Sequence, residues 1–140
     1  VTVLTLTKFP TCWCGRTGCL DCFLSLGGLE TEYHNITQTR LDIKAIAAAA
    51  DASNLVASSF LQALDDRIGR TTAMIINMFD PDVIFLGGRL AGLDRLYQNV
   101  PRKWPGYLLV ERNETKLQKA NQDAFTLAKG AACLAIDPVM

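Results

Sequence analysis

Apolar residues recur every three or four positions across residues 53–79, which is the period of one helix face. This spacing predicts a long amphipathic helix in the middle of the chain. Asp66 and Arg70 lie four residues apart and can pair on its outer face. Asp80-Pro81 ends the pattern, because proline has no amide hydrogen and clashes with the preceding turn. The inward stripe is expected to consist of Val56, Phe60, Leu64, Ile68, Thr72, Ile75 and Phe79.

Gly69 lies inside this predicted helix. A glycine there lowers helix stability by about 1 kcal/mol relative to alanine. We therefore interpret Gly69 as a point where another part of the chain packs closely against the helix.

The region after the long helix alternates between strand and helix patterns. Val83–Leu86 is an unbroken apolar run, which predicts a central strand covered on both faces. Pro101 closes the helix that follows it. Further strands are expected over residues 107–110 and 114–120, and a last helix over 124–136. The apolar face of the helix before Pro101 consists of Leu93, Leu96, Tyr97 and Val100.

The first part of the chain has shorter elements. Residues 1–7 alternate apolar residues with threonine, which is typical of a half-buried strand. A short helix is expected over residues 20–26, and Gly27-Gly28 is expected to stop it. Asp42 can cap another short helix. Since helices alternate with strands, the fold class is α/β.

The polar stretch over residues 30–40 is expected to be a loop. It contains His34, the single histidine of the chain. We interpret His34 as a solvent-exposed loop residue rather than a metal ligand, because nothing around it in the sequence suggests coordination.

Composition limits the kind of protein this can be. Residues 1–140 suffice for a single domain, and an apolar content of 49% argues against disorder. Lys plus Arg and Asp plus Glu each number 14, so bulk charge favours neither nucleic acid nor an anionic membrane. No apolar run is long enough to span a bilayer, and the start does not resemble a signal peptide. Without an initiating methionine, the chain is expected to be a piece of something longer.

Residues 12–22 hold four of the five cysteines, in the pattern C-x-C-G-x-x-G-C followed by one more thiol. Zinc takes about four soft ligands, and Gly15 and Gly18 allow sharp turns between them. The alternatives are a disulfide and inert buried thiols, although a bridge between neighbouring cysteines would close a strained ring. Such a cluster fits a reducing cytoplasm. The predicted ligands are Cys12, Cys14, Cys19 and Cys22, with water as another candidate for the fourth position and His34 ranked below both.

Gly87-Gly88 follows the predicted strand Val83–Leu86 directly. Paired glycines at the carboxyl end of a strand allow a ligand to approach the backbone closely. The alternative is a turn that needs glycine for its own geometry. The segment is neither a Walker A loop nor G-x-G-x-x-G.

The knuckle, C-x-C-G-x-x-G-C followed by Leu-Asp, resembles the signature of the ROK family of bacterial sugar kinases and sugar-responsive repressors. Residues 77–88, N-M-F-D-P-D-V-I-F-L-G-G, resemble a second family segment, N-x-x-D-P-x-x-I-x-L-G-G. D-R-L-Y at 94–97 and K-G-A-A at 129–132 also occur at the expected places. The resemblance implies the carboxyl-terminal lobe of a ribonuclease-H-like (actin/hexokinase) fold, with residues 82–140 on the nucleotide side.

The resemblance also implies site residues and a reaction. ROK kinases transfer a phosphoryl group from ATP, with magnesium, to a sugar hydroxyl. Gly87 and Gly88 match the glycine pair that lies against the adenosine, and Asp21 matches the sugar-contacting glutamate. Asp21 could equally be a residue that is simply favourable in the first turn of a helix. A zinc in the knuckle would be structural. The motifs are nearest to the fructokinase branch, so the expected substrate is a hexose, with fructose favoured.

Several family features are absent or changed. The histidine upstream of the knuckle is missing, since residues 1–11 contain none, and the usual glutamate is Asp21. The third glycine of the nucleotide segment is Arg89, and the aspartate-glycine turn before the last helix is Asp123-Ala124. The phosphate loop D-x-G-G-T and the catalytic aspartate belong to the missing amino-terminal lobe. We therefore expect the chain alone to be inactive and to self-associate through its uncovered inter-lobe face.

Two other functions fit the same residues. The chain could be the sensor domain of a ROK repressor, which shares the fold and adds an upstream helix-turn-helix. It could also be a zinc-stabilised module without catalysis. The preceding coding sequence distinguishes them, because D-x-G-G-T favours a kinase and a DNA-binding domain favours a repressor.

Overall fold

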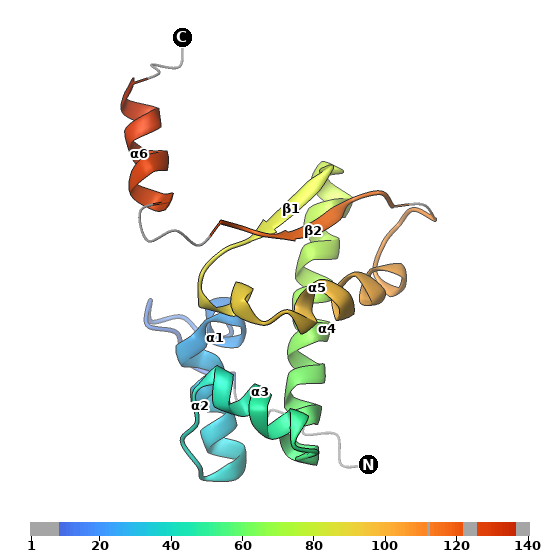
Figure 1. The fold of residues 1–140 in the computed structure, drawn as a ribbon. Helices are drawn as coiled ribbons and strands as arrows, with labels where there is room; N and C mark the ends of the chain where they lie inside the picture. The colour runs from blue at the N-terminus through green and yellow to red at the C-terminus, as the bar shows by residue number, and fades with distance from the viewer. Residues whose placement is uncertain (1–8, 112, 122–125, 137–140) are drawn as a thin grey trace.

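The computed structural model describes residues 9–111, 113–121 and 126–136. The strand expected over residues 1–7 and the Asp123-Ala124 turn lie outside these ranges. A long helix, α4 (Leu55–Phe79), runs through the molecule (Figure 1). Three short helices gather beside its amino-terminal half, and a small sheet lies near its carboxyl-terminal end. Helices and a parallel strand pair together confirm the α/β class.

Helix α4 confirms the main prediction from the apolar pattern. It begins after Asn54, whose side chain accepts a hydrogen bond from the Ala57 amide at 3.0 Å. It ends at Asp80, in the left-handed conformation with φ 43°. On the outer face, Arg70 pairs with Asp66 as expected. The predicted stripe is buried at Phe60, Leu64, Ile68 and Thr72.

The two ends of the predicted stripe are wrong. Val56, Ile75 and Phe79 are partly or largely exposed, and Phe79 retains 71% of its accessible surface. The buried face passes instead through Ala57 and Ile76, each one residue further along. One turn of an α-helix takes 3.6 residues. A stripe predicted with steps of three or four residues can therefore move off the buried face toward its ends.

The core forms where shorter elements cover α4. Leu29 and Tyr33 come from α2, and the Tyr33 ring meets Phe60 edge-on, with 5.2 Å between ring centroids. Trp104 donates its indole N–H to the Thr72 hydroxyl at 2.8 Å, which explains how Thr72 fits within an apolar stripe. The other fully buried anchors are Ile46, Leu61, Leu64, Leu96 and Val100.

The polar stretch over residues 30–40 is not a loop up to residue 37. Helix α1 (Asp21–Leu24) is one turn long, and α2 (Leu26–Thr37) follows it at once. Ser25 caps α2 by accepting the Gly28 amide at 3.2 Å. Gly27-Gly28 therefore lies inside the first turn of α2 and does not stop a helix. The next helix, α3 (Ile43–Asp51), is capped by Asp42 as predicted.

Helix α2 is held to α4 by a two-pronged ion pair. The Arg67 guanidinium donates to both carboxylate oxygens of Glu32, at 2.6 and 2.7 Å. The same guanidinium lies 5.5 Å from the centre of the Phe23 ring in α1. One side chain of α4 thus fixes both short helices.

Strand β1 (Val83–Leu86) confirms the predicted strand. It pairs in parallel with β2 (Lys116–Lys119), with Val83 opposite Lys116 and Leu86 opposite Lys119. The expectation that both faces are covered is wrong, because Phe85 is 58% exposed while Ile84 and Leu86 pack against the core. Between the strands lie η1 (Arg89–Gly92), α5 (Arg95–Asn99) and η2 (Pro101–Gly106). Pro101 thus begins a further helical segment as well as ending α5.

Residues 107–110 form a turn and a bend instead of the predicted strand. The Asn77 side chain donates to the Tyr107 carbonyl and accepts from the Leu109 amide, each at 3.0 Å. These backbone groups are therefore satisfied by a side chain of α4 rather than by a neighbouring strand.

A buried carboxylate ties α4 to α5. Asp65 is 2% exposed, and its Oδ2 accepts hydrogen bonds from Arg95 at 2.7 Å and from Asn99 at 2.9 Å. A buried charge needs such partners, so α5 has one favoured position along α4.

Helix α6 (Thr126–Ile136) stands apart from the rest of the chain (Figure 1). Its described side chains are exposed, namely Ala128, Lys129, Ala131, Ala132, Cys133 and Ala135. Among the described helices, none is long and apolar enough to cross a membrane.

The close contact predicted at Gly69 exists, and it yields a stability prediction. A Cβ atom added at Gly69 would lie 2.7 Å from the Cβ of Lys103 in η2. Because that atom is fixed to the backbone, α4 and η2 must separate. We expect Gly69→Ala to lower the free energy of unfolding by about 1–3 kcal/mol, measured by urea titration. Gly130→Ala in α6, where a Cβ meets open space, is the control. A Gly69→Ala chain as stable as wild type would contradict the packing argument.

Candidate functional site

The cysteine knuckle is a tight loop closed by backbone hydrogen bonds. Thr11 and Thr17 form an antiparallel bridge. Inside it, the Cys12 amide donates to the Arg16 carbonyl at 2.7 Å, and the Gly15 amide donates to the Cys12 carbonyl at 2.9 Å. The predicted glycine turns are present, because Gly15 and Gly18 have φ of 83° and 74°.

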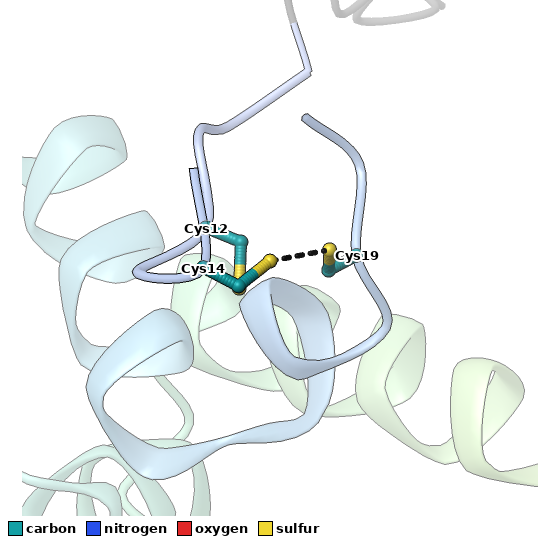
Figure 2. A group of neighbouring side chains, drawn as sticks. All are labelled: Cys12, Cys14 and Cys19. Carbon is teal, nitrogen blue, oxygen red and sulfur yellow. Dashed lines mark hydrogen bonds between the residues drawn. The ribbon is translucent and has the colours of Figure 1, made fainter. Parts of the chain in front are cut away.

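Three of the predicted ligands converge in this loop. The sulfurs of Cys12, Cys14 and Cys19 all lie within 4.8 Å of one another, and Figure 2 shows the three side chains close together, with Cys14 pointing toward Cys19. The Cys14 and Cys19 sulfurs are 3.5 Å apart. In a tetrahedral zinc site with Zn–S bonds of about 2.3 Å, sulfurs lie about 3.8 Å apart. The three thiols therefore have a spacing that fits such a metal ion.

Cys22 lies outside this three-thiol group. It belongs to α1, one turn beyond Cys19, and its thiol points to the Pro10 carbonyl, with 3.9 Å between Sγ and oxygen. The structure thus brings three of the four predicted ligands together and leaves Cys22 beside them.

The thiols perturb one another strongly. The backbone N–H of Arg16, followed by the Cys19 and Cys12 thiols, lowers the pKa of Cys14. The hydrogen bond to Cys14 raises the pKa of Cys19 to about 12, with removal from water adding to the shift. Removal from water, and next the hydrogen bond to Cys12, raises the pKa of Cys22. One thiolate at Cys14 therefore opposes ionisation of its neighbours, and a cation among them would remove that opposition.

Gly28 positions the element that follows the knuckle. A Cβ atom at Gly28 would lie 2.2 Å from the Cys22 carbonyl oxygen and 2.7 Å from its carbonyl carbon. The first turn of α2 thus packs directly on the backbone of α1. The sequence interpretation missed this role, since a glycine pair after a short helix is also the usual signal for a helix end.

The remaining predicted site residues lie elsewhere. Asp21 is exposed in the first turn of α1, two residues after Cys19. His34 is not a loop residue; it lies on α2, is half-buried, and is absent from the thiol group. Its Nδ1 is buried and has no hydrogen-bond partner within the described ranges.

Gly87 and Gly88 connect β1 to η1. Gly88 has φ of 73°, so its backbone conformation requires glycine. A Cβ atom at either residue would meet open space, so internal packing does not explain the glycine at position 87. The space beside the Cα atoms of these two glycines is therefore empty within the described part of the chain. Arg89 follows this turn directly and is exposed.

The family model described as "ROK family" matches residues 4–138. The chain belongs to the ROK family. Its curated relatives include the N-acetyl-D-glucosamine kinase of Pasteurella multocida (strain Pm70), which is 32% identical over 123 residues. That alignment covers 88% of this chain and 40% of the relative. This ROK chain thus spans about two fifths of the length of that kinase.

Solved structures of ROK proteins share the fold. The ROK hexokinase from Thermus thermophilus aligns with a TM-score of 0.76 at 24% identity, over 95% of this chain and 45% of its own. A ROK glucokinase from Streptomyces griseus, solved with glucose and AMPPNP, gives 0.73 at 22%, over 91% and 47%. A ROK transcriptional regulator, a homolog of the E. coli MLC protein, gives 0.67 at 24%, over 81% and 32%. The fold of this chain is therefore shared by ROK kinases and a ROK regulator.

Packing at Gly28 gives a test of how the knuckle is supported. We expect Gly28→Ala to lower the free energy of unfolding by about 1–3 kcal/mol or more, because α1 must move away from α2. The same movement should speed alkylation of the half-buried Cys22 thiol. Iodoacetamide labelling followed by peptide mass spectrometry measures the second effect. Gly27→Ala is the matched control, since a Cβ there meets nothing within 4 Å. Equal Cys22 labelling in the two variants would contradict this role.

Proposed function

We propose that this chain is part of the carboxyl-terminal lobe of an ATP-dependent hexose kinase. The observation that carries the proposal is its 32% identity, over 88% of its length, to a curated sugar kinase of the ROK family. The phosphate loop and the catalytic aspartate expected of such a kinase have no counterpart in the sequence. The complete reaction therefore needs an amino-terminal lobe as partner.

The proposed role of the knuckle is a structural zinc site. Cys12, Cys14 and Cys19 would hold the ion, and their sulfur spacing supports that assignment. Cys22 is the proposed fourth ligand in the place of the family histidine, because it follows Cys19 by one helical turn, with its amide donating to the Cys19 carbonyl at 3.0 Å. When bound, zinc in a closed site of four ligands supplies rigidity rather than reactivity. Such a site requires reduced thiols, which fits a cytoplasmic protein.

Asp21 is the proposed sugar contact. Its carboxylate is exposed at the start of α1, immediately after the knuckle, and can accept hydrogen bonds from sugar hydroxyls. Fructose remains the substrate proposed from the sequence motifs. N-acetyl-D-glucosamine, the sugar in the name of the Pasteurella multocida relative, is the alternative hexose.

Gly87 and Gly88 are the proposed nucleotide contact. The empty space beside their Cα atoms, at the carboxyl end of β1, supports close approach of an adenosine, with magnesium and the phosphates held by the other lobe. Arg89 takes the place of a third glycine, so its side chain would border the same ligand.

A sugar-sensing domain of a ROK repressor is the second candidate. The fold similarity to a ROK transcriptional regulator supports it. The two candidates differ in what precedes this lobe in the gene, which sequencing upstream would identify.

Self-association also remains a proposal. Large apolar side chains at the end of α4 and on β1 are exposed, and such surfaces favour association. Sedimentation at high protein concentration is the test. These residues are Met74, Met78, Phe79 and Phe85.

We expect the purified chain of 140 residues to show no phosphorylation of fructose, glucose, mannose or N-acetyl-D-glucosamine in a coupled ATP assay. The reason is the missing phosphate loop and catalytic aspartate. The same assay on the full-length gene product should reveal the preferred hexose. Turnover by the 140-residue chain within the usual enzyme range of about 1–10³ s⁻¹ would overturn the proposal.

Zinc content and sulfur coordination test the fourth ligand. We expect the wild-type chain to bind zinc with four sulfurs, and Cys22→Ala to bind it more weakly with three sulfurs and a lighter donor. X-ray absorption at the zinc edge counts the sulfurs. Cys133→Ala is the control, because Cys133 is exposed on α6. If Cys22→Ala retains the wild-type affinity and sulfur count, Cys22 is not a ligand.

A further inference from the structure

Cys14 and Cys19 are the best-placed thiols for forming a covalent bond with each other. Their sulfurs are 3.5 Å apart, whereas a disulfide requires about 2.05 Å. Cys14 is exposed and Cys19 half-buried, so a dissolved oxidant can reach the pair. Gly15 and Gly18 lie between them, and residues of this type adapt readily to a change of loop shape.

The other pairings are less favourable. Cys12 is buried, with 6% of its surface accessible, and it is only two residues from Cys14. A bridge between residues so close in the chain closes a strained ring. Cys22 faces the Pro10 carbonyl, and Cys133 lies on the distant helix α6. The geometry therefore favours one disulfide among several conceivable ones.

We propose that Cys14 and Cys19 form a redox-sensitive pair that a peroxide converts to a disulfide, and that this disulfide and a bound metal ion exclude each other. The proposed disulfide rests on the geometry of the two thiols alone. The exclusion rests on the proposed function of the knuckle as a zinc site.

The chemistry balances in two steps. The Cys14 sulfur attacks one oxygen of hydrogen peroxide and the O–O bond breaks. The other oxygen takes the thiol proton and departs as water, and Cys14 becomes a sulfenic acid. The Cys19 sulfur then attacks the sulfenic sulfur, the S–O bond breaks, and a second water leaves as the S–S bond forms. One peroxide is reduced to two waters, and two thiols are oxidised to one disulfide.

The disulfide removes two of the three clustered ligands. Only Cys12 and Cys22 then remain as thiols in the knuckle, which is too few for a four-ligand zinc site. Conversely, sulfurs that hold zinc have fewer lone pairs free for attack on peroxide. Oxidation should therefore release the metal, and metal should slow oxidation.

The experiment treats the reduced, metal-stripped chain with hydrogen peroxide and maps disulfides by differential alkylation and mass spectrometry. Trypsin cleaves after Arg16, so a Cys14–Cys19 bridge appears as two linked peptides. Because Cys12 shares the first peptide and Cys22 the second, Cys12→Ser and Cys22→Ser identify the partners. We expect the linked peptides in wild type, in both of these variants and in Cys133→Ser, and their loss in Cys14→Ser.

A second arm loads the chain with zinc and follows release with a chromogenic zinc indicator. We expect one zinc released for each disulfide formed, and slower oxidation than in the stripped chain. Circular dichroism of each variant checks that it is folded. A predominant Cys12–Cys14 bridge, an intermolecular Cys133 bridge, or sulfinic acid without a Cys14–Cys19 bridge would overturn the redox pair.

The arms separate the two proposals. If the stripped chain forms the Cys14–Cys19 disulfide but takes up no zinc, the pair stands and the proposed metal site fails. If the chain binds zinc but the stripped form yields no such disulfide, the redox proposal fails and the metal site stands.

Discussion

The structure depends on burial of one face of helix α4. The elements around it are short: α1 has four residues, α3 has nine and α5 has five. Helices of this length are marginal by themselves in water. They persist because side chains such as Leu29, Ile46 and Leu96 are buried in the core around the long helix. Burial of each such side chain stabilises the folded state by about 1.5–3 kcal/mol. The sites are held in place by the same packing, since Arg67 of α4 contacts α1 directly after the knuckle.

Elements with strong local signals could be predicted from the sequence. The period of α4, the cap at Asp42 and the apolar run of β1 each depend on neighbouring residues, and each prediction is confirmed. Helix α2 was missed because its outer face is polar, and its burial rests on two residues one turn apart, Leu29 and Tyr33. The strand predicted over residues 107–110 fails because Asn77, about thirty residues earlier, binds that backbone.

In the candidate site, too, features set by neighbouring residues could be predicted, whereas features set by contacts between elements could not. The density of cysteines and the two glycines could be recognised from spacing, and the loop brings three sulfurs together as that spacing implies. The position of Cys22 could not be predicted, because it depends on a one-turn helix packed against Gly28. Nor could the unequal ionisation of the thiols, which requires knowing that the Arg16 amide faces Cys14. The sequence thus predicts which residues form the cluster, whereas the orientation of each thiol depends on contacts that exist only in the folded chain.

The parallel pairing of β1 with β2 has a consequence for the order in which the chain folds. Pairing Val83 with Lys116 requires closing the chain between them into a loop, and that loop contains η1, α5 and η2. Closing this loop costs chain entropy before the strand pair gains any hydrogen bond, whereas α3 and α4 are adjacent in the sequence and contact each other across a short loop. The helical half can therefore act as the nucleus on which the sheet assembles late. The turn carrying Gly87 and Gly88 would then be among the last parts of the chain to reach its final conformation.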